Sequence, residues 1–285
     1  MDVCRYVKNP RPRAGAAMSI DDLDWIVTMT IVCVMIRDRT DLEHTFGGST
    51  RLWASAGHHE VHQEWWLALS GDADVNFNLA FSSSSDSAVL AQCCLQPVLD
   101  HGKPGIIMVA GPGLATAQVL ADAKWVNIGA RPLMLLKPLP VGKPASTGVR
   151  ALAADELDLA RQVVTETFGV DHRSAKTAIP DSVAERDNVT VWGLFEEDRL
   201  VASVAIVEED GLAVIWSMAT LPESQGRGYG RRLIEVALRE QLEKGATGSL
   251  LYSSVAGENL YRGLGYEVIE YLQMWSRPRW VLGLA

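Results

Sequence analysis

The feature that most constrains this 285-residue chain is a glycine-rich loop, residues 225–230, between a predicted strand and a predicted helix. The strand ends at Thr220, and the helix opens at Arg231. Because glycine has no Cβ, successive N–H groups of such a loop can turn toward one point. The helix that follows adds about half a positive elementary charge at its N-terminus. The sequence therefore predicts an anion cradle that fits a pyrophosphate.

The spacing of the glycines excludes the two commoner phosphate loops. A Walker loop needs Gly-Lys followed by Ser or Thr, and the dinucleotide fingerprint needs G-x-G-x-x-G. The loop reads Gln-x-x-Gly-x-Gly, which resembles the Arg/Gln-x-x-Gly-x-Gly/Ala pattern of the GNAT superfamily of acyl-CoA-dependent N-acyltransferases. Residues 260–266 are similar to the Leu-Tyr-x-x-Leu-Gly-Phe/Tyr signature of the same family. An ordinary turn at the start of a helix is the alternative reading of the loop.

The hydrophobic pattern of the second half predicts the order β-β-β-α-β-α-β. The expected strands are residues 189–195, 200–207, 212–220, 249–253 and 266–275, and the expected helices are residues 231–244 and 258–264. With helices also expected at 155–168 and 182–186, this order is similar to the whole GNAT core over residues 147–278. The resemblance implies an α/β fold of mixed α+β type, with a mostly antiparallel central sheet and flanking helices.

The resemblance also implies which residues bind an acyl-CoA. A splayed strand ending at residues 218–220 would pair with the amides of the pantetheine arm, and the glycine loop would hold the pyrophosphate. The implied cofactor-binding residues are Met218, Ala219, Thr220, Gln225, Gly226, Arg227, Gly228, Tyr229, Gly230, Arg231 and Ser254. Ser254 stands where many relatives have asparagine, and its shorter side chain puts that contact in doubt.

Tyr261 is the candidate catalytic residue. The family often uses this tyrosine to protonate the departing thiolate, and a phenol with a pKa near 10 suits that task. The alternative is a buried tyrosine that anchors its helix.

No general base can be named from the sequence. The strand before the glycine loop, residues 212–220, contains no Asp, Glu or His. Glu208 and Glu209 adjoin a hairpin turn and are expected to be surface charges. Asp171 and His172 lie in a loop that usually borders the acceptor pocket in this family, and a lone loop histidine is most often a surface side chain.

The first half ends with elements that repeat those of the second. A strand at 106–110, a Gly-Pro-Gly turn, a helix at 114–123 and a strand at 125–136 align without gaps when Trp125 is placed on Tyr266. Leu120 then stands at the position of Tyr261, and no Gln/Arg-x-x-Gly-x-Gly occurs before the linker. This is similar to tandem GNAT-like domains with a degenerate N-terminal copy, although many α/β domains end in strand, helix and strand.

The resulting division of the chain has four parts. Residues 1–18 are expected to be a flexible tail, in which Met18 is an alternative start. Residues 19–137 form the degenerate domain, 138–146 a linker rich in proline and glycine, and 147–285 the catalytic domain. Strands are also expected at 64–69 and 75–81, and residues 25–36 are expected to be a core helix or strand.

Composition limits the partners. A formal net charge of −9 argues against a nucleic-acid surface, and the apolar run at 25–36 is too short for a membrane helix. The chain shows no signal-peptide pattern, and its four cysteines are expected to be reduced thiols in the cytoplasm. His58 and His62 share a face, but a structural zinc site needs four ligands, so no metal is expected.

These features predict an N-acetyltransferase. Acetyl-CoA is the acyl donor, and the acceptor is an amine of a small molecule or peptide that attacks the thioester directly in a ternary complex. The alternative is a catalytically lapsed CoA-binding sensor or partner-binding module, which the missing strand carboxylate favours.

Overall fold

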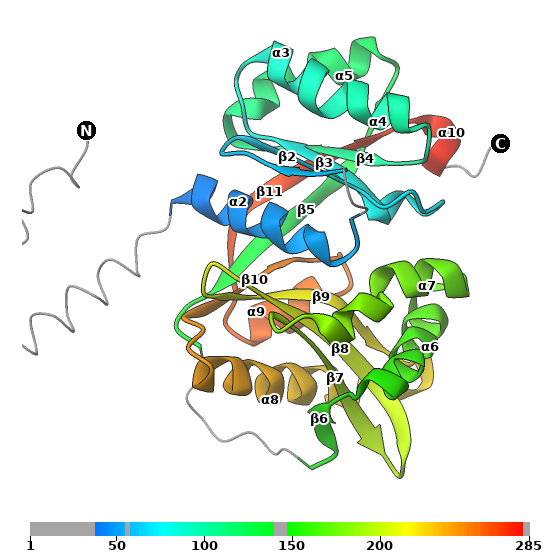
Figure 1. The fold of residues 1–285 in the computed structure, drawn as a ribbon. Helices are drawn as coiled ribbons and strands as arrows, with labels where there is room; N and C mark the ends of the chain where they lie inside the picture. The colour runs from blue at the N-terminus through cyan, green and yellow to red at the C-terminus, as the bar shows by residue number, and fades with distance from the viewer. Residues whose placement is uncertain (1–37, 55–57, 140–146, 282–285) are drawn as a thin grey trace, which may run out of the picture. The chain divides into compact units, whose positions relative to one another are not determined.

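The computed structural model describes residues 38–54, 58–139 and 147–281, and these lie within one compact unit, Asp38–Ala285. The predicted tail, residues 25–36, most of the linker, Cys4 and Cys33 lie outside the described residues. A single 11-stranded sheet runs through the unit, with helices of both halves packed on it (Figure 1). Among the described helices, none is long and apolar enough to cross a bilayer.

The first half contributes five strands to the sheet. Its elements are α2 (Arg39–Ser49), η2 (Thr50–Leu52), β1 (His59–Val61), β2 (Trp65–Leu69), η3 (Val75–Phe77), β3 (Asn78–Ser82), α3 (Ser87–Val89), η4 (Leu90–Leu95), α4 (Gln96–His101), β4 (Ile106–Val109), η5 (Gly111–Thr116), α5 (Gln118–Asp122) and β5 (Val126–Leu136). Two predicted elements were wrong in part. Residues 75–77 form a 3₁₀ turn capped by Asp74 rather than the start of a strand, and α5 begins only at Gln118 because η5 precedes it.

The second half contributes six strands. Its elements are β6 (Val149–Ala151), η6 (Ala154–Glu156), α6 (Leu157–Phe168), α7 (His172–Ala178), η7 (Asp181–Glu185), β7 (Val189–Glu196), β8 (Arg199–Glu209), β9 (Leu212–Thr220), η8 (Pro222–Ser224), α8 (Tyr229–Glu243), β10 (Gly248–Tyr252), α9 (Glu258–Gly263), β11 (Glu267–Ser276) and α10 (Pro278–Val281). The strands match the predicted order, and the predicted helix at 182–186 is the 3₁₀ turn η7. The mixed α/β fold class is therefore confirmed, but one continuous sheet takes the place of the separate central sheet expected in each of two GNAT-like domains.

The two halves exchange their last strands. The sheet order is β1-β2-β3-β4-β11-β5-β10-β9-β8-β7-β6, so β5 lies between β10 and β11, and β11 lies between β4 and β5. Glu267 pairs with Leu135, and Ser276 pairs with Val126. When Trp125 is aligned with Tyr266, Val126 corresponds to Glu267 and Leu135 corresponds to Ser276. The two strands therefore pair with each other symmetrically. Two separate sheets would each leave an edge with unpaired backbone groups, and the exchange pairs those edges with each other.

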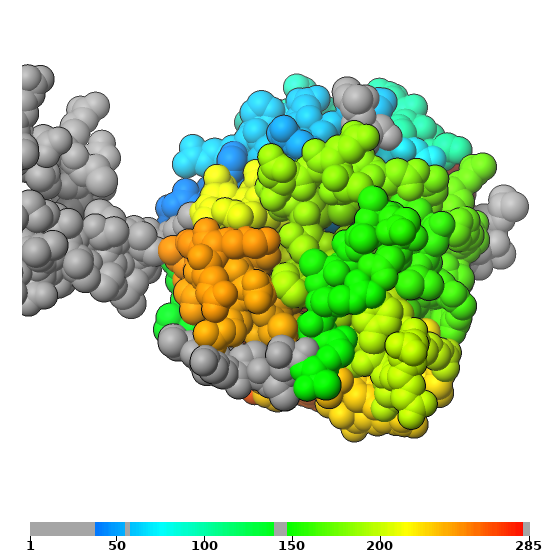
Figure 2. All heavy atoms as spheres, turned by 60° about the horizontal axis from the view of Figure 1, so that its bottom comes forward, coloured from blue at the N-terminus to red at the C-terminus, as the bar shows by residue number. Residues whose placement is uncertain are grey.

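The helix α2 crosses the sheet between the helices of the two halves (Figure 1). Asp38 caps its N-terminus by accepting the N–H of Asp41 at 2.9 Å. Thr45 Oγ1 donates to Asp210 Oδ2 at 2.9 Å, and in Figure 2 the surface of α2 (blue) meets that of the turn between β8 and β9 (yellow). A second link joins the halves at Asp72, which accepts from Ser174 Oγ at 2.7 Å. Side chains of the first half thus contact both the turn between β8 and β9 and the helix α7.

A buried ionic cluster joins α2 to β11. The Glu43 carboxyl group, in a residue only 3% exposed, lies close to the carboxyl group of Glu270. Ser83 Oγ donates to Glu43 Oε2 at 2.6 Å, and Arg39 Nη1 lies 3.2 Å from Glu270 Oε2. Two carboxylates beside one guanidinium are neutral only when they share a proton. Burial, followed by the contact with Glu270, raises the pKa of Glu43 to about 8.

This cluster predicts a pH-dependent stability. Because the pKa of Glu43 is about 8 in the folded chain against an ordinary 4.5, the folded state binds more protons between these values, and the free energy of unfolding falls as pH rises through that window. Glu43→Gln removes the titration. Its unfolding free energy should fall less with pH and exceed that of the wild type above the folded pKa, by a few kcal/mol at ~1.4 kcal/mol per pKa unit.

Urea denaturation across the same pH range measures this effect. Glu60→Gln serves as the control, because the Glu60 side chain is 54% exposed and, among the described residues, forms an ion pair with His62 alone. An unchanged pH slope in Glu43→Gln would contradict the shared proton.

Candidate functional site

The glycine loop turns through two left-handed glycines just before α8. Gly226 and Gly228 adopt φ values of +74° and +80°, which L side chains rarely adopt, and Gly228 is the N-cap residue of α8. Among the described residues, none accepts a hydrogen bond from the six consecutive N–H groups of residues 226–231. The first turn of an α-helix leaves its N–H groups free in this way, and together with the helix dipole they favour an anion.

Strand β9 opens away from β10 beside this loop. The two strands pair only from Leu212–Gly248 to Ile215–Leu251, so the end of β9 has no strand partner on that side. Ser217 has a φ of +51°, and the register with β8 shifts there, so that Ser217 and Met218 together oppose Val204. This is a β-bulge, which re-aims the backbone of the strand.

The loop, β9 and α9 converge at Gly230. A Cβ at Gly230 would lie 3.0 Å from Met218 Cε and 3.5 Å from Leu260 Cδ2, so only glycine fits this approach without displacement. The carbonyl of Thr220 already accepts from Gln225 Nε2 at 3.0 Å and from Thr167 Oγ1 at 3.1 Å. Gln225 therefore fixes the loop to the end of β9.

Tyr261 is the buried residue of the short helix α9. The residue is 7% exposed, its ring lies 5.5 Å from that of Tyr266, and no described residue accepts from or donates to its hydroxyl group. Burial raises the pKa of Tyr261, so the phenol keeps its proton at neutral pH. Tyr266, by contrast, donates to Ser249 Oγ at 2.7 Å. Of the two neighbouring tyrosines, Tyr261 is the one whose hydroxyl group has no partner in the described part of the chain.

The arginines near the loop differ in their partners. Arg227 Nη1 lies 3.8 Å from Glu196 Oε2, and Arg231 donates to the carbonyl of Gly263 at 3.0 Å. Arg232 has a buried Nε without a described hydrogen-bond partner. The hydroxyl of Tyr229 is hydrogen-bonded to Glu196. Arg231 thus joins α8 to α9, while Arg227 and Tyr229 both contact Glu196 at the end of β7.

The remaining predicted residues serve local structure. Ser254 Oγ accepts the N–H of Gly257 at 3.1 Å at the start of α9. Asp171 caps α7 by accepting from Ser174 N at 2.8 Å, and His172 is exposed. Glu209 is half-buried beneath α2 rather than a free surface charge, and burial raises its pKa. None of these carboxylates has contacts that tie it to Tyr261 or to the bulge.

The histidines considered for a metal do not come together. His62 stacks on Trp65, with ring centroids 4.1 Å apart, whereas His58 lies against His101 at 5.1 Å. Across the described part of the chain, no group of three His, Cys, Asp or Glu side chains could hold a metal ion.

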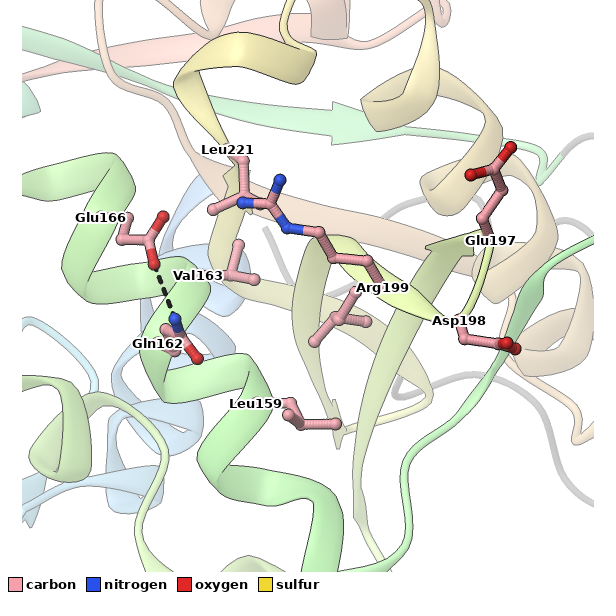
Figure 3. A pocket seen from close by; sticks show the side chains of 9 residues that line it. Leu159, Gln162, Val163, Glu166, Glu197, Asp198, Arg199 and Leu221 are labelled. Atoms are coloured by element: carbon pink, nitrogen blue, oxygen red, sulfur yellow. Dashed lines mark hydrogen bonds between the residues drawn. The ribbon is translucent and has the colours of Figure 1, made fainter.

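One pocket in the second half lies apart from these residues. It has a volume of about 330 Å³ between α6 and the turn joining β7 to β8, as Figure 3 shows. Leu159, Gln162 and Glu166 line it from α6, and Gln162 donates to Glu166 within its wall. Among the predicted site residues, none lines this pocket. The pocket and the predicted site residues are therefore separate parts of the second half.

Sequence reasoning missed residues at the contact between the halves. Trp216, on β9 just before the bulge, contacts α2, and its strand pattern carried no sign of this role. Glu43 precedes Phe46 by three residues and lies on the same apolar face of α2. A carboxylate on such a face indicates a buried charge that needs a partner, and this could have been read from the sequence.

Comparisons of the sequence and of the fold relate this chain to known acetyltransferases. Residues 187–268 match the sequence profile of the acetyltransferase (GNAT) domain. An uncharacterized N-acetyltransferase of Bacillus subtilis, YlbP, is 28% identical over 82 residues, which are 25% of this chain; the match spans about half (51%) of that relative's length.

Solved structures share the fold across both halves. A GCN5-related N-acetyltransferase from Kribbella flavida superposes with a TM-score of 0.57 at 20% identity, covering 77% of this chain and 89% of that one. A GCN5-related N-acetyltransferase from Sphaerobacter thermophilus gives 0.53 at 13% identity, covering 84% and 90%. Residues 187–268 are therefore similar to a GNAT acetyltransferase domain, and the solved structures show that the chain shares the fold of such proteins.

Proposed function

We propose that the chain is an N-acetyltransferase that takes acetyl-CoA as acyl donor and an amine of a small molecule or peptide as acceptor. The observation that carries this proposal is the row of six N–H groups, residues 226–231, that have no acceptor among the described residues and lie next to the open edge of β9. A pyrophosphate at the loop and a pantetheine arm along β9 would use both. Because the carbonyl of Thr220 is occupied, we assign the pantetheine contact mainly to Met218.

The proposed reaction is direct transfer. The lone pair of the neutral amine attacks the thioester carbon, and backbone N–H groups at the bulge stabilise the negative charge on the carbonyl oxygen. The C–S bond breaks, Tyr261 gives its proton to the sulfur, and the new amide nitrogen loses its proton to water. Solvent is assigned the last step because β9 carries no carboxylate or histidine.

Thiol release tests the activity. The full chain is incubated with acetyl-CoA and a panel of amines, and free CoA is measured over time. Amine-dependent release supports the transferase. Binding of acetyl-CoA without release by any amine would favour a lapsed CoA-binding module, and absence of binding would reject both.

One acyl-CoA is expected per chain, bound by the second half. In the first half the equivalent space is closed, because β3 and β4 stay paired up to Ser82 and Val109 and a Cβ at Gly113 would lie 2.5 Å from the carbonyl oxygen of Ser82. Pro112 lacks an N–H, and Leu120 replaces the tyrosine. We therefore regard the first half as a degenerate copy that packs against the second. Calorimetric titration with CoA measures the stoichiometry, and a value of two would overturn this assignment.

A further inference from the structure

The indole of Trp216 is held by side chains from the other half of the chain. Its Nε1 donates to Ser49 Oγ at 2.9 Å. The ring of Phe46 stacks on it, with centroids 4.9 Å apart and planes at 28°, and Trp53 meets it edge-on at 6.0 Å and 83°. All three partners come from α2 and the turn that follows it. In the sequence, Ser49 precedes Trp216 by 167 residues.

Trp216 is the last residue before the bulge of β9. Ser217 follows it with a φ of +51°, a conformation that costs a non-glycine residue free energy. Beyond Ile215 the strand has no pairing with β10, and Ser217 and Met218 share one opposing residue in β8. Neighbouring strands therefore give this backbone little support, and a strained conformation persists only where the surroundings determine it.

The support comes from an anchored helix. Ser49 Oγ, fully buried, donates to the carbonyl of Phe46 at 2.6 Å while it accepts from Trp216. The helix α2 is in turn joined to β11 through Arg39 and to the turn after β8 through Thr45. The helix α2, which is itself joined to β11 and to the turn after β8, thus holds the indole of Trp216.

We propose that α2 of the first half positions the reacting backbone, with Ser49 and Phe46 holding Trp216 so that the bulge at Ser217 and Met218 keeps its shape. This inference rests on the proposed acyl transfer, because the bulge matters where its N–H groups face the thioester oxygen. Trp216 is then a positioning residue. The first half contributes to the site by fixing the conformation of β9, and not only by packing against the second half. A misplacement of about 1 Å at such a site costs ~10²-fold in rate.

Trp216→Phe tests the proposal in the full chain. Phenylalanine keeps an aromatic ring against Phe46 but removes the N–H that reaches Ser49. We expect kcat to fall by about 10- to 10²-fold with little change in the KM for acetyl-CoA, since the pyrophosphate loop is untouched. Ser49→Ala should have a similar effect, and the double variant should be no worse than either, because both remove one interaction.

The control is Trp275→Phe. The Trp275 indole also donates one hydrogen bond, to Gln273 Oε1 at 2.9 Å, but on β11 and away from the bulge. It should leave kcat unchanged. Hydrogen exchange of residues 216–220 gives a readout independent of turnover, and Trp216→Phe should speed it by about tenfold while Trp275→Phe does not.

The outcomes separate two failures. A wild type without amine-dependent turnover would contradict the proposed function, while exchange of the bulge amides would still decide whether α2 orders them. Unchanged exchange in Trp216→Phe, or an equal loss of kcat in Trp275→Phe, would overturn the positioning role.

Discussion

Tyr261→Phe is expected to lower kcat by ~10²–10⁴ while leaving the affinity for acetyl-CoA nearly unchanged. The substitution keeps the buried ring beside Tyr266 and removes only the hydroxyl group, which has no described hydrogen-bond partner to lose. If that hydroxyl protonates the sulfur, the thiolate must leave without an acid. Because burial raises the pKa of Tyr261, the wild type should show no loss of activity from this group up to the ordinary phenol pKa near 10.

Tyr266→Phe is the matched control for this prediction. It removes a hydroxyl from a tyrosine packed against the same ring, but one that donates to Ser249. It should reduce the free energy of unfolding by ~0.5–1.5 kcal/mol and leave kcat unchanged. Equal kcat for Tyr261→Phe and wild type would assign Tyr261 to packing alone.

Gly228→Val is expected to abolish the rise in melting temperature caused by acetyl-CoA. In the wild type that rise corresponds to ~2.7 kcal/mol of stabilisation at a hundredfold excess over Kd. Gly228 has a φ of +80° with no atom within 4 Å of a Cβ, so valine meets backbone strain rather than a clash. To relieve that strain the loop must rotate, and its N–H groups would no longer point to one place.

Gly245→Val separates strain from binding. Gly245 follows the same helix, has a φ of +102° and likewise has open space around a Cβ. This variant should lose a similar amount of stability but keep the full acetyl-CoA shift. A shift that survives in Gly228→Val, or a wild type that shows none with millimolar acetyl-CoA, would remove the cofactor assignment.

Much of the local structure could be predicted from the sequence. The strands β7 to β11 and the helix α8 follow from hydrophobic periods of two and 3.6 residues, and these periods depend on near neighbours alone. The glycine spacing predicted a cradle, and the left-handed φ values of Gly226 and Gly228 are what such spacing allows. Where prediction of elements was wrong, as at η3 and η5, short 3₁₀ turns carry no period of their own.

The sequence by itself determined which residues form the glycine loop and which tyrosine follows it. It also determined that each half ends in a strand, a helix and a strand. Only the tertiary structure decided that β5 and β11 exchange places, that Arg39 meets Glu270 across 231 residues, and that Ser49 meets the indole next to the bulge. Glycine conformations and helix starts depend on residues a few positions apart, so the nearby sequence is enough to predict them. Strand exchange and buried charge pairs depend on which distant surfaces cover one another, and that choice is made by the whole packed chain.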